Sequence, residues 1–256
     1  MENYPGFPGG VRGEDLIERM SKQLDSLGVR VTRACVENIS LSARAFLVKS
    51  DGGMFSARTL IVATGTLPRS DTLGSRSLLG TKIFNELTEM PLDRIAGKRV
   101  IVVGGGDAAF DYALNLLGRG ADVIVVSRSK PKCLSLLLAR AEAAGAEIVV
   151  GANPKSVAGA SSGVRLLCQR SDGSVGFTAD FVLMACGRVP NLGLLSPALR
   201  KKIGKLSIIP RTNVPGLFVA GDVVRGAHRQ TGIAVGDGIR AAMLAEEYLR
   251  KGAGES

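Results

Sequence analysis

The residues with the clearest chemical meaning are three glycines and an alanine that follow a short apolar run. Val100 to Val103 read as a buried strand, and Gly104, Gly106 and Ala109 then follow with G-x-G-x-x-A spacing. In a dinucleotide site the first glycine allows a tight turn and the second lets backbone amides approach a pyrophosphate, while the third small residue lets the helix pack closely. The start of that helix adds free N–H groups and partial positive charge. The predicted binding residues are Gly104, Gly105, Gly106, Asp107, Ala108 and Ala109.

A glycine-rich turn in some other α/β fold is the alternative interpretation of this motif. The apolar run Ala121 to Val126 follows the predicted helix and completes a strand–helix–strand unit. Because a dinucleotide site needs that unit, the context favours nucleotide binding.

The end of the second strand indicates which nicotinamide nucleotide would bind. An NAD site usually has an acidic residue there for the ribose 2′-hydroxyl, and the segment 125–132 contains none. Its polar and basic residues are Ser127, Arg128, Lys130 and Lys132. One cation about 4 Å from a 2′-phosphate contributes ~1 kcal/mol in water and ~4 kcal/mol at an effective dielectric of about 20. We therefore predict NADPH over NADH, the alternative being that Arg128 faces solvent in a site of relaxed choice.

The composition is that of a globular protein and excludes several function classes. The 256 residues are 45% hydrophobic and 22% charged, enough for one large or two modest domains. The sequence has no apolar run of the ~18 residues that a membrane helix needs, and its start does not resemble a signal peptide. Four scattered cysteines predict neither a metal site nor a disulfide framework, which makes the cytoplasm the default compartment.

The basic balance, a formal net charge of +10, attracts anions such as phosphorylated cofactors or acidic proteins. The basic residues are scattered, and the chain has no tryptophan and no aromatic residues among a basic stripe. We therefore expect no nucleic-acid partner and interpret most of these charges as solvated surface.

Hydrophobic periodicity predicts mixed helices and strands on either side of the motif. We expect a helix from Leu16 to Leu27 that ends at Gly28, and a helix from Arg240 to Arg250 with Ala242, Met243, Tyr248 and Leu249 facing inward. A hairpin should turn at Ser171 to Gly173. The other expected strands are 29–31, 46–48, 54–55, 59–63, 181–185 and 217–220.

Four further segments fall in a recognisable order around the motif. They are Glu2-Asn-Tyr-Pro-Gly-Phe-Pro8, Ala63-Thr-Gly65, Cys186-Gly-Arg-Val-Pro-Asn191, and Gly221-Asp222 leading to Arg229 through Gly238. Together the five resemble the FAD- and NAD(P)H-dependent thioredoxin reductases, which are class II pyridine nucleotide-disulfide oxidoreductases. The resemblance extends over nearly the whole chain and includes the disulfide-free branch, the thioredoxin-reductase-like ferredoxin–NADP reductases.

This resemblance implies an α/β fold with two Rossmann-like domains and a homodimer. A nicotinamide (NAD(P)-binding) domain, 89–207, is expected as an insertion in a discontinuous FAD-binding domain, 1–88 and 208–256, with hinges near Glu89 and Ser207. Family members begin with another G-x-G-x-x-G unit, whereas this chain starts at the Asn-Tyr-Pro-Gly loop. The flavin domain is therefore expected to be N-terminally truncated, with weak or absent FAD binding.

The resemblance also assigns roles to individual residues. Asp222, which follows Gly221, is expected to bind the ribityl chain of FAD. Arg229, Gln230 and Thr231 should lie against the isoalloxazine ring, where the start of their helix favours negative charge. The remaining residues implied to bind cofactor are Asn3, Ala63, Thr64, Gly65, Gly187 and Arg188. No catalytic side chain beyond the cofactors is required, and His228 is expected to be structural or exposed.

One departure from the family changes the expected activity. Thioredoxin reductases carry a C-x-x-C pair just before the second fingerprint, and the corresponding stretch here, Phe84 to Pro91, has no cysteine. Without a dithiol, electrons from NADPH and FAD should pass directly to an acceptor, either a small molecule or a ferredoxin-like acidic protein. Asp111 to Leu114 resembles the ferredoxin-reductase branch. The alternatives are a thioredoxin-disulfide reductase homologue and a truncated, non-catalytic NADP(H)-binding protein.

Overall fold

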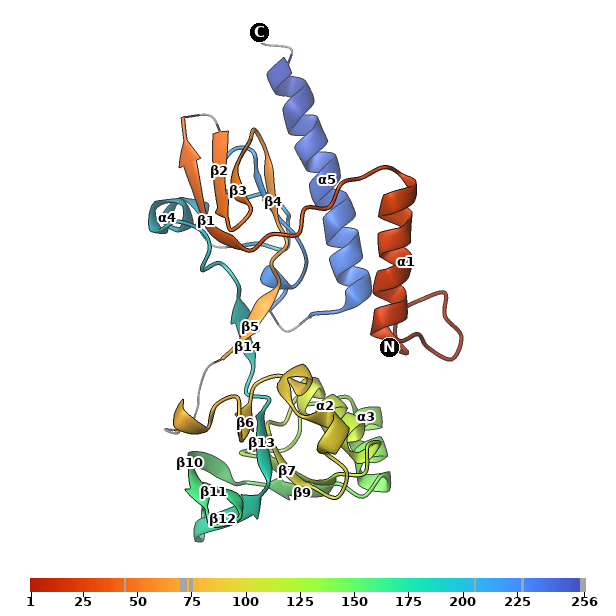
Figure 1. Cartoon of the computed structure of the whole chain (residues 1–256), viewed down its shortest axis with the longest axis vertical. Helices are drawn as coiled ribbons and strands as arrows, with labels where there is room; N and C mark the ends of the chain where they lie inside the picture. Colours follow the sequence, from red (N-terminus) through yellow and green to blue (C-terminus); the bar gives the residue numbers. More distant parts are fainter. Residues whose placement is uncertain (44, 70–72, 74–75, 205, 227, 254–256) are drawn as a thin grey trace. The chain divides into compact units, whose positions relative to one another are not determined.

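The chain forms two compact units in its computed structural model (Figure 1). The structure describes residues 1–43, 45–69, 73, 76–204, 206–226 and 228–253. Unit 1 comprises Met1–Leu67 and Val189–Ser256, and unit 2 comprises Pro68–Arg188. The chain therefore leaves unit 1 once and returns to it once. Glu89 lies in unit 2 and Ser207 in unit 1.

Unit 2 is built on a five-stranded parallel sheet with the order β6-β13-β7-β8-β9. The strands are β6 (Ile83–Phe84), β13 (Phe181–Met184), β7 (Arg99–Val103), β8 (Asp122–Ser127) and β9 (Glu147–Val150). Helices α2 (Asp107–Leu117) and α3 (Ser135–Ala143) supply the connections that parallel strands require. The antiparallel sheet β10 (Asn153–Ala160), β11 (Gly163–Arg170) and β12 (Gly173–Ala179) completes the unit, with the short helices η1 (Arg76–Leu78), η2 (Leu87–Glu89) and η3 (Leu92–Arg94).

The parallel sheet is buried on both faces, which explains the continuous apolar runs of its strands. Val100 and Val102 of β7 join the core shared with α2 and α3, whereas Ile101 and Val103 join the core shared with the antiparallel sheet. All four side chains are at most 2% exposed. Burying each such side chain contributes about 1.5–3 kcal/mol, so β7 is a central element of the unit.

Unit 1 combines a long helix, a parallel strand pair and a three-stranded antiparallel sheet. β1 (Val36–Ser42), β2 (Ala45–Ser50) and β3 (Gly53–Ala57) form the sheet, and β4 (Leu60–Val62) pairs with β15 (Leu217–Val219) in parallel. The other elements are α1 (Gly13–Ser26), α4 (Pro197–Ile203), η4 (Gly221–Val223) and α5 (Thr231–Ala253). The two connections between the units run through β5 (Thr66–Pro68) and β14 (Arg188–Pro190), which pair with each other.

Several of the expected elements are confirmed. The parallel pairing of β7 with β8 flanks the glycine motif, and β11 and β12 form the expected hairpin, with Arg170 opposite Gly173. The first helix is present, but only Leu16 on it is buried, and Ile17 is 62% exposed.

Two expectations were wrong. Val29–Val31 form no strand, and both valines are exposed, because no neighbouring segment pairs with them. The C-terminal helix begins at Thr231 rather than near Arg240, and its inward residues are Ala241 and Ala245, not Ala242 and Met243. Tyr248 is 41% exposed, but its ring contacts Phe218 edge-on. A helical face is fixed by what it packs against, and a pattern of alanines does not specify which side that is.

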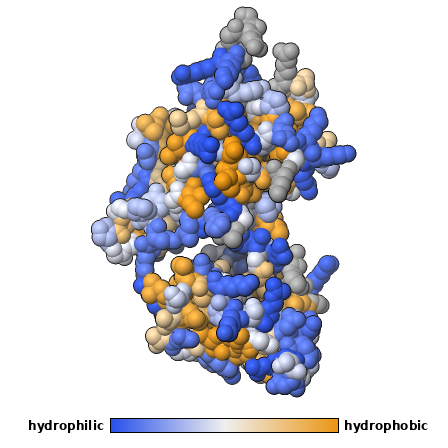
Figure 2. Space-filling view, turned by 180° about the vertical axis from the view of Figure 1, so that it is seen from behind, coloured by the Kyte–Doolittle hydropathy of each residue, from blue (hydrophilic) through white to orange (hydrophobic). Residues whose placement is uncertain are grey.

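Apolar and hydrophilic patches are interspersed over the surface seen in Figure 2. Large apolar side chains with more than half of their surface exposed include Ile17, Leu27, Ile239 and Met243. Within the described part of the chain, no helix combines the length and apolar content needed to cross a membrane.

The close packing of α2 on β7 predicts unequal effects at two adjacent alanines. Ala109 is 0% exposed in the helix-side core, whereas Ala108 is exposed. Ala109→Leu should lower the free energy of unfolding by about 1–3 kcal/mol, because the core has no room for three more carbons. Ala108→Leu, the matched control, should change it by less than about 0.5 kcal/mol in the same urea titration. Equal effects would contradict the packing described here.

Candidate functional site

The glycine turn between β7 and α2 is shaped by two close backbone approaches. Gly104 has φ +154, and a Cβ there would lie 2.5 Å from the carbonyl oxygen of Ala185, which follows β13. A Cβ on Gly105 would overlap Ser127 Oγ at the end of β8. A Cβ on Gly106 would meet no atom within 4 Å, so this backbone faces open space. The turn therefore needs glycine for packing at two positions and leaves its third open to a ligand.

The segment after β8 is held against this turn by hydrogen bonds. The backbone N–H of Lys132 donates to the carbonyl oxygen of Gly105 over 2.7 Å, and Ser127 Oγ donates to the carbonyl oxygen of Ser129 over 2.6 Å. The Asp107 carboxylate accepts from the backbone N–H of Leu134 over 2.8 Å. These contacts fold the predicted 2′-phosphate segment over the start of α2.

The resulting cavity, which we call the nucleotide pocket, has a volume of about 420 Å³, within the range typical of small-ligand sites. Seven predicted residues line it: Gly104, Gly105, Gly106, Ser127, Arg128, Lys130 and Lys132. Sequence analysis missed Arg69, Asn153 and Cys186, which also line it. Arg69 lies far upstream of the motif, and nothing in its local sequence marks it.

The nucleotide pocket is strongly cationic. Its charged lining residues are Arg69, Arg128, Lys130 and Lys132, and none of the described residues that line it is acidic. Among the described residues, no carboxylate forms an ion pair with any of these four cations. Unneutralised cations beside a helix amino terminus favour a ligand with several phosphates.

Three residues predicted for this site, and two that the resemblance implies to bind cofactor, do not line the pocket. Asp107, Ala108 and Ala109 form the first turn of α2, where Ala109 is buried in the core. Gly187 and Arg188 follow β13. The Arg188 side chain points toward Glu86 and Tyr112, and we call these three residues the Glu86 cluster. There Arg188 forms an ion pair with Glu86 Oε1, and Tyr112 Oη donates to Glu86 Oε2 over 2.8 Å. Burial, with a further contribution from Glu86, raises the pKa of Tyr112, so the phenol keeps its proton and remains a donor.

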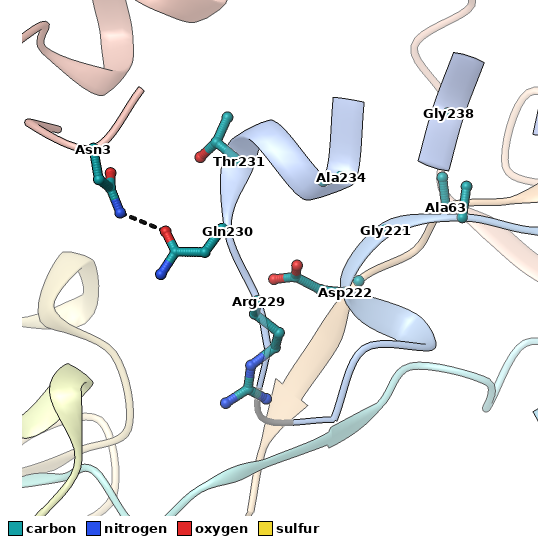
Figure 3. Close-up of a pocket in the computed structure, with 11 residues that line it drawn as sticks. Asn3, Ala63, Gly221, Asp222, Arg229, Gln230, Thr231, Ala234 and Gly238 are labelled. Atoms are coloured by element: carbon teal, nitrogen blue, oxygen red, sulfur yellow. Dashed lines mark hydrogen bonds between the residues drawn. The ribbon is translucent and has the colours of Figure 1, made fainter. Parts of the chain in front are cut away.

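Unit 1 contains a second cavity, of about 490 Å³, which we call the unit 1 pocket (Figure 3). Eight predicted residues line it, from three separate segments of the chain: Asn3, Ala63, Gly65, Gly221, Asp222, Arg229, Gln230 and Thr231. The Asn3 amide donates a hydrogen bond to Gln230 Oε1, which joins the N-terminal loop to the start of α5. Thr64 does not line the cavity; its hydroxyl donates to the carbonyl oxygen of Asn191 over 2.6 Å.

The unit 1 pocket has the polar groups that a flavin site requires. Asp222 and the side chains of Arg229 and Gln230 line one cavity that also opens on the start of α5 (Figure 3). Gly238 on α5 contributes bare helix surface, since a Cβ there would meet no atom within 4 Å. A carboxylate, amides and a guanidinium around an open surface fit a ring with donors and acceptors on its edge. His228 is exposed and does not line the cavity.

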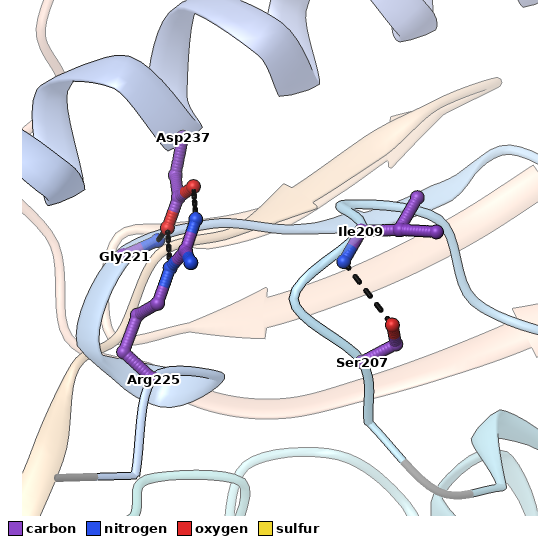
Figure 4. A network of polar contacts seen from close by, with 5 residues as sticks. All are labelled: Ser207, Ile209, Gly221, Arg225 and Asp237. Carbon is purple, nitrogen blue, oxygen red and sulfur yellow. Dashed lines mark hydrogen bonds and ion pairs between the residues drawn. The ribbon is translucent and has the colours of Figure 1, made fainter. Parts of the chain in front are cut away.

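Asp237, which sequence analysis missed, fixes the loop that carries Asp222 (Figure 4). Its carboxylate is 4% exposed, pairs with both Nε (2.7 Å) and Nη2 of Arg225, and accepts from the N–H of Gly221 over 3.3 Å. The hydrogen bond from Arg225 holds the pKa of Asp237 below its ordinary value of 3.8. An acidic residue between two glycines inside a long helix is the only sequence signal of this role.

Among the described residues, no group of three or more His, Cys, Asp or Glu side chains is arranged to hold a metal ion. Cys168 is buried, and burial raises its pKa to about 11, so this thiol stays protonated at neutral pH.

Comparisons with known proteins agree with this geometry. Residues 79–238 match the family model for pyridine nucleotide-disulphide oxidoreductases. A thioredoxin reductase from Coxiella burnetii is 31% identical over 97% of this chain and 83% of its own length. Crystal structures of the thioredoxin reductases of Lactococcus lactis and T. acidophilum superpose with TM-scores of 0.83 and 0.84 at 22% and 23% identity. Each match covers 98% of this chain, and 85% and 84% of the two reductases.

The Arg225–Asp237 pair predicts pH-dependent stability. At pH 7 Asp237→Asn should lower the free energy of unfolding by about 2–4 kcal/mol, because it leaves the Arg225 charge half-buried without a counter-ion. The folded-state pKa of Asp237 is lowered, so its stabilisation is present above 3.8 and is lost as the pH falls through the folded-state value. Urea titrations should therefore show the difference from the unmodified chain shrinking as the pH falls from about 5 to 3.

Asp93→Asn is the matched control for this experiment, since its pair with Arg94 is exposed, at 71% and 85% of the two side chains. It should change stability by less than about 0.5 kcal/mol at either pH. A difference at Asp237 that stays constant down to pH 3 would contradict a lowered folded-state pKa.

Proposed function

The chain belongs to the pyridine nucleotide-disulphide oxidoreductase family, and we propose that it is a flavin-dependent NADPH oxidoreductase without a dithiol relay. Matched relatives are named thioredoxin reductases, one of them NADPH-dependent, and the resemblance to this family implies FAD as the second cofactor. In this proposal unit 2 binds NADPH, unit 1 binds the flavin, and an acceptor that is a small molecule or an acidic ferredoxin-like protein takes the electrons directly.

The observation that carries the NADPH half of the proposal is the nucleotide pocket. Its open Gly106 backbone and the start of α2 meet four cations in one cavity, and none of these cations forms an ion pair with a carboxylate of the described residues. A pyrophosphate bridge fits the backbone amides of the turn, and Arg128 at the end of β8 suits a 2′-phosphate. The absence of an acid from the lining argues against NADH, whose ribose hydroxyl needs an acceptor.

In the flavin half, the residues of the unit 1 pocket have distinct tasks. When bound, the flavin supplies the redox chemistry, accepting a hydride and releasing electrons to the acceptor. Asp222 accepts hydrogen bonds from hydroxyl groups of the ribityl chain. Arg229 and Gln230 orient the ring edge, and the start of α5 beside Thr231 favours negative charge there. The Asp237 carboxylate holds the Gly221–Asp222 backbone in place.

The absence of a dithiol relay is supported by the Glu86 cluster. The stretch Phe84 to Pro91 contains no cysteine, and the whole sequence has no C-x-x-C pair. Glu86, within this stretch, forms an ion pair with Arg188 and accepts a hydrogen bond from Tyr112. A carboxylate cannot exchange with a disulfide, and none of these three groups can carry a pair of electrons.

Thioredoxin-disulfide reduction is the second candidate, because matched relatives are named thioredoxin reductases. That reaction needs two cysteines close in the chain, and the four cysteines here are separated by at least 18 positions, as between Cys168 and Cys186. This spacing favours the direct route to an acceptor.

Nucleotide preference tests the NADPH half. Arg128→Ala should weaken NADPH binding by about tenfold or more and leave NADH binding within about twofold, because only NADPH carries the 2′-phosphate. Calorimetric titration measures both affinities. Arg119→Ala is the control, as this arginine lies in unit 2 outside the pocket. Equal affinities for the two nucleotides, unchanged by Arg128→Ala, would overturn the preference for NADPH.

Electron transfer itself is tested by a dye-reduction assay with the whole chain. With FAD added, NADPH should reduce an artificial dye acceptor, whereas a thioredoxin disulfide should not be reduced above background. Tight NADPH binding without dye reduction would instead support a non-catalytic NADP(H)-binding protein.

A cysteine-free variant tests in the same assay whether a thiol takes part. In this variant Cys35, Cys133 and Cys186 are changed to Ser, and Cys168 is changed to Ala. Its rate of dye reduction should stay within about threefold of the unmodified chain, because no thiol carries electrons in the proposed route. Loss of turnover in a variant that remains folded and still binds NADPH would show that a cysteine takes part.

A further inference from the structure

We propose that Arg69 is a second phosphate-binding residue of the nucleotide pocket, one that contacts the pyrophosphate from the nicotinamide side. The proposal rests on the proposed function, because it takes this pocket as an NADPH site. It adds a residue that lies outside the glycine fingerprint and outside the segment that follows β8.

Arg69 is anchored beside the end of β13. Its backbone N–H donates to the carbonyl oxygen of Gly187 over 3.0 Å. Its side chain runs along this glycine, with Cδ and Nε each 3.9 Å from where a Cβ on Gly187 would lie. The Arg69 side chain therefore passes Gly187 at ordinary van der Waals distance, and it lines the same cavity as Gly105 and Gly106.

The order of the strands separates Arg69 from Arg128. β13, β7 and β8 are neighbours in that order, and the glycine turn follows the central strand β7. Neighbouring strands lie ~4.8 Å apart, so Arg69 beside β13 and Arg128 after β8 flank the turn on opposite sides. A dinucleotide whose pyrophosphate lies on the turn has its two nucleosides on opposite sides as well. With Arg128 on the adenosine 2′-phosphate, Arg69 is on the nicotinamide side of the bridge.

The chemistry of Arg69 matches this position. Its side chain is exposed, and within the described part of the chain no carboxylate forms an ion pair with it. A guanidinium has five N–H donors in a rigid fork that matches phosphate oxygens. A guanidinium that lines this pocket, without a carboxylate partner among the described residues, therefore suits the phosphate of the nicotinamide half.

Two adenosine ligands separate this role from general electrostatic attraction. Adenosine 2′,5′-bisphosphate lacks the second phosphate of the bridge, whereas 2′-phospho-ADP-ribose has it. Calorimetric titration of the whole chain should show that Arg69→Ala weakens 2′-phospho-ADP-ribose about tenfold and adenosine 2′,5′-bisphosphate less than twofold. Arg69→Lys should recover part of the loss, and Arg128→Ala should weaken both ligands.

Arg94→Ala is the matched control, since Arg94 is an exposed arginine of unit 2 that does not line the pocket. It should leave both affinities unchanged. Equal losses for the two ligands in Arg69→Ala, or no loss for either, would overturn the role proposed for Arg69. If the unmodified chain bound neither ligand, the proposed function itself would fail.

Discussion

The close approach of three strand ends at the glycine turn is the constraint on which unit 2 depends. Gly104 lies against the carbonyl group after β13, and Gly105 lies against Ser127 at the end of β8. A side chain at position 104 would clash with the backbone after β13, and one at position 105 would displace the Ser127 hydroxyl. The same close packing leaves backbone amides, rather than side chains, at the N-terminus of α2. In the proposed function, packing and phosphate binding therefore require the same small residues, and a change that loosens the packing also weakens phosphate binding.

Unit 1 meets a similar requirement by a different device. There the loop after β15 is held by the buried carboxylate of Asp237 through Gly221 and Arg225 rather than by close backbone packing. A buried charge is costly unless it is paired, so the loop conformation and the ion pair stabilise each other. This ion pair therefore fixes the position of Asp222, which follows Gly221. Asp222, which lines the unit 1 pocket, is thus held in position by Asp237, which does not line it.

The sequence was sufficient where the signal is local and failed where it depends on a distant partner. Apolar strands next to glycines identified β7, β8 and the turn, because backbone geometry and burial act over a few residues. Glycines 232, 236 and 238 weakened the helical pattern, so the first turns of α5 were missed, although the pocket uses that bare surface. Val29–Val31 form no strand because no segment pairs with them, and Arg69 reaches the pocket only when the chain folds. Neither outcome can be predicted from the residues next to these positions.

The charge distribution bears on how an acceptor can be chosen. The sequence carries a formal net charge of +10, and one pocket is lined by four cations that form no ion pair with a carboxylate among the described residues. Such a concentration raises the local density of polyanions and speeds their association, with a strong dependence on ionic strength. In the Glu86 cluster, by contrast, the Arg188 cation is paired with the Glu86 carboxylate. In the proposed function, the cations of the nucleotide pocket therefore attract the phosphorylated nucleotide, and the electron acceptor is selected by contacts outside this pocket.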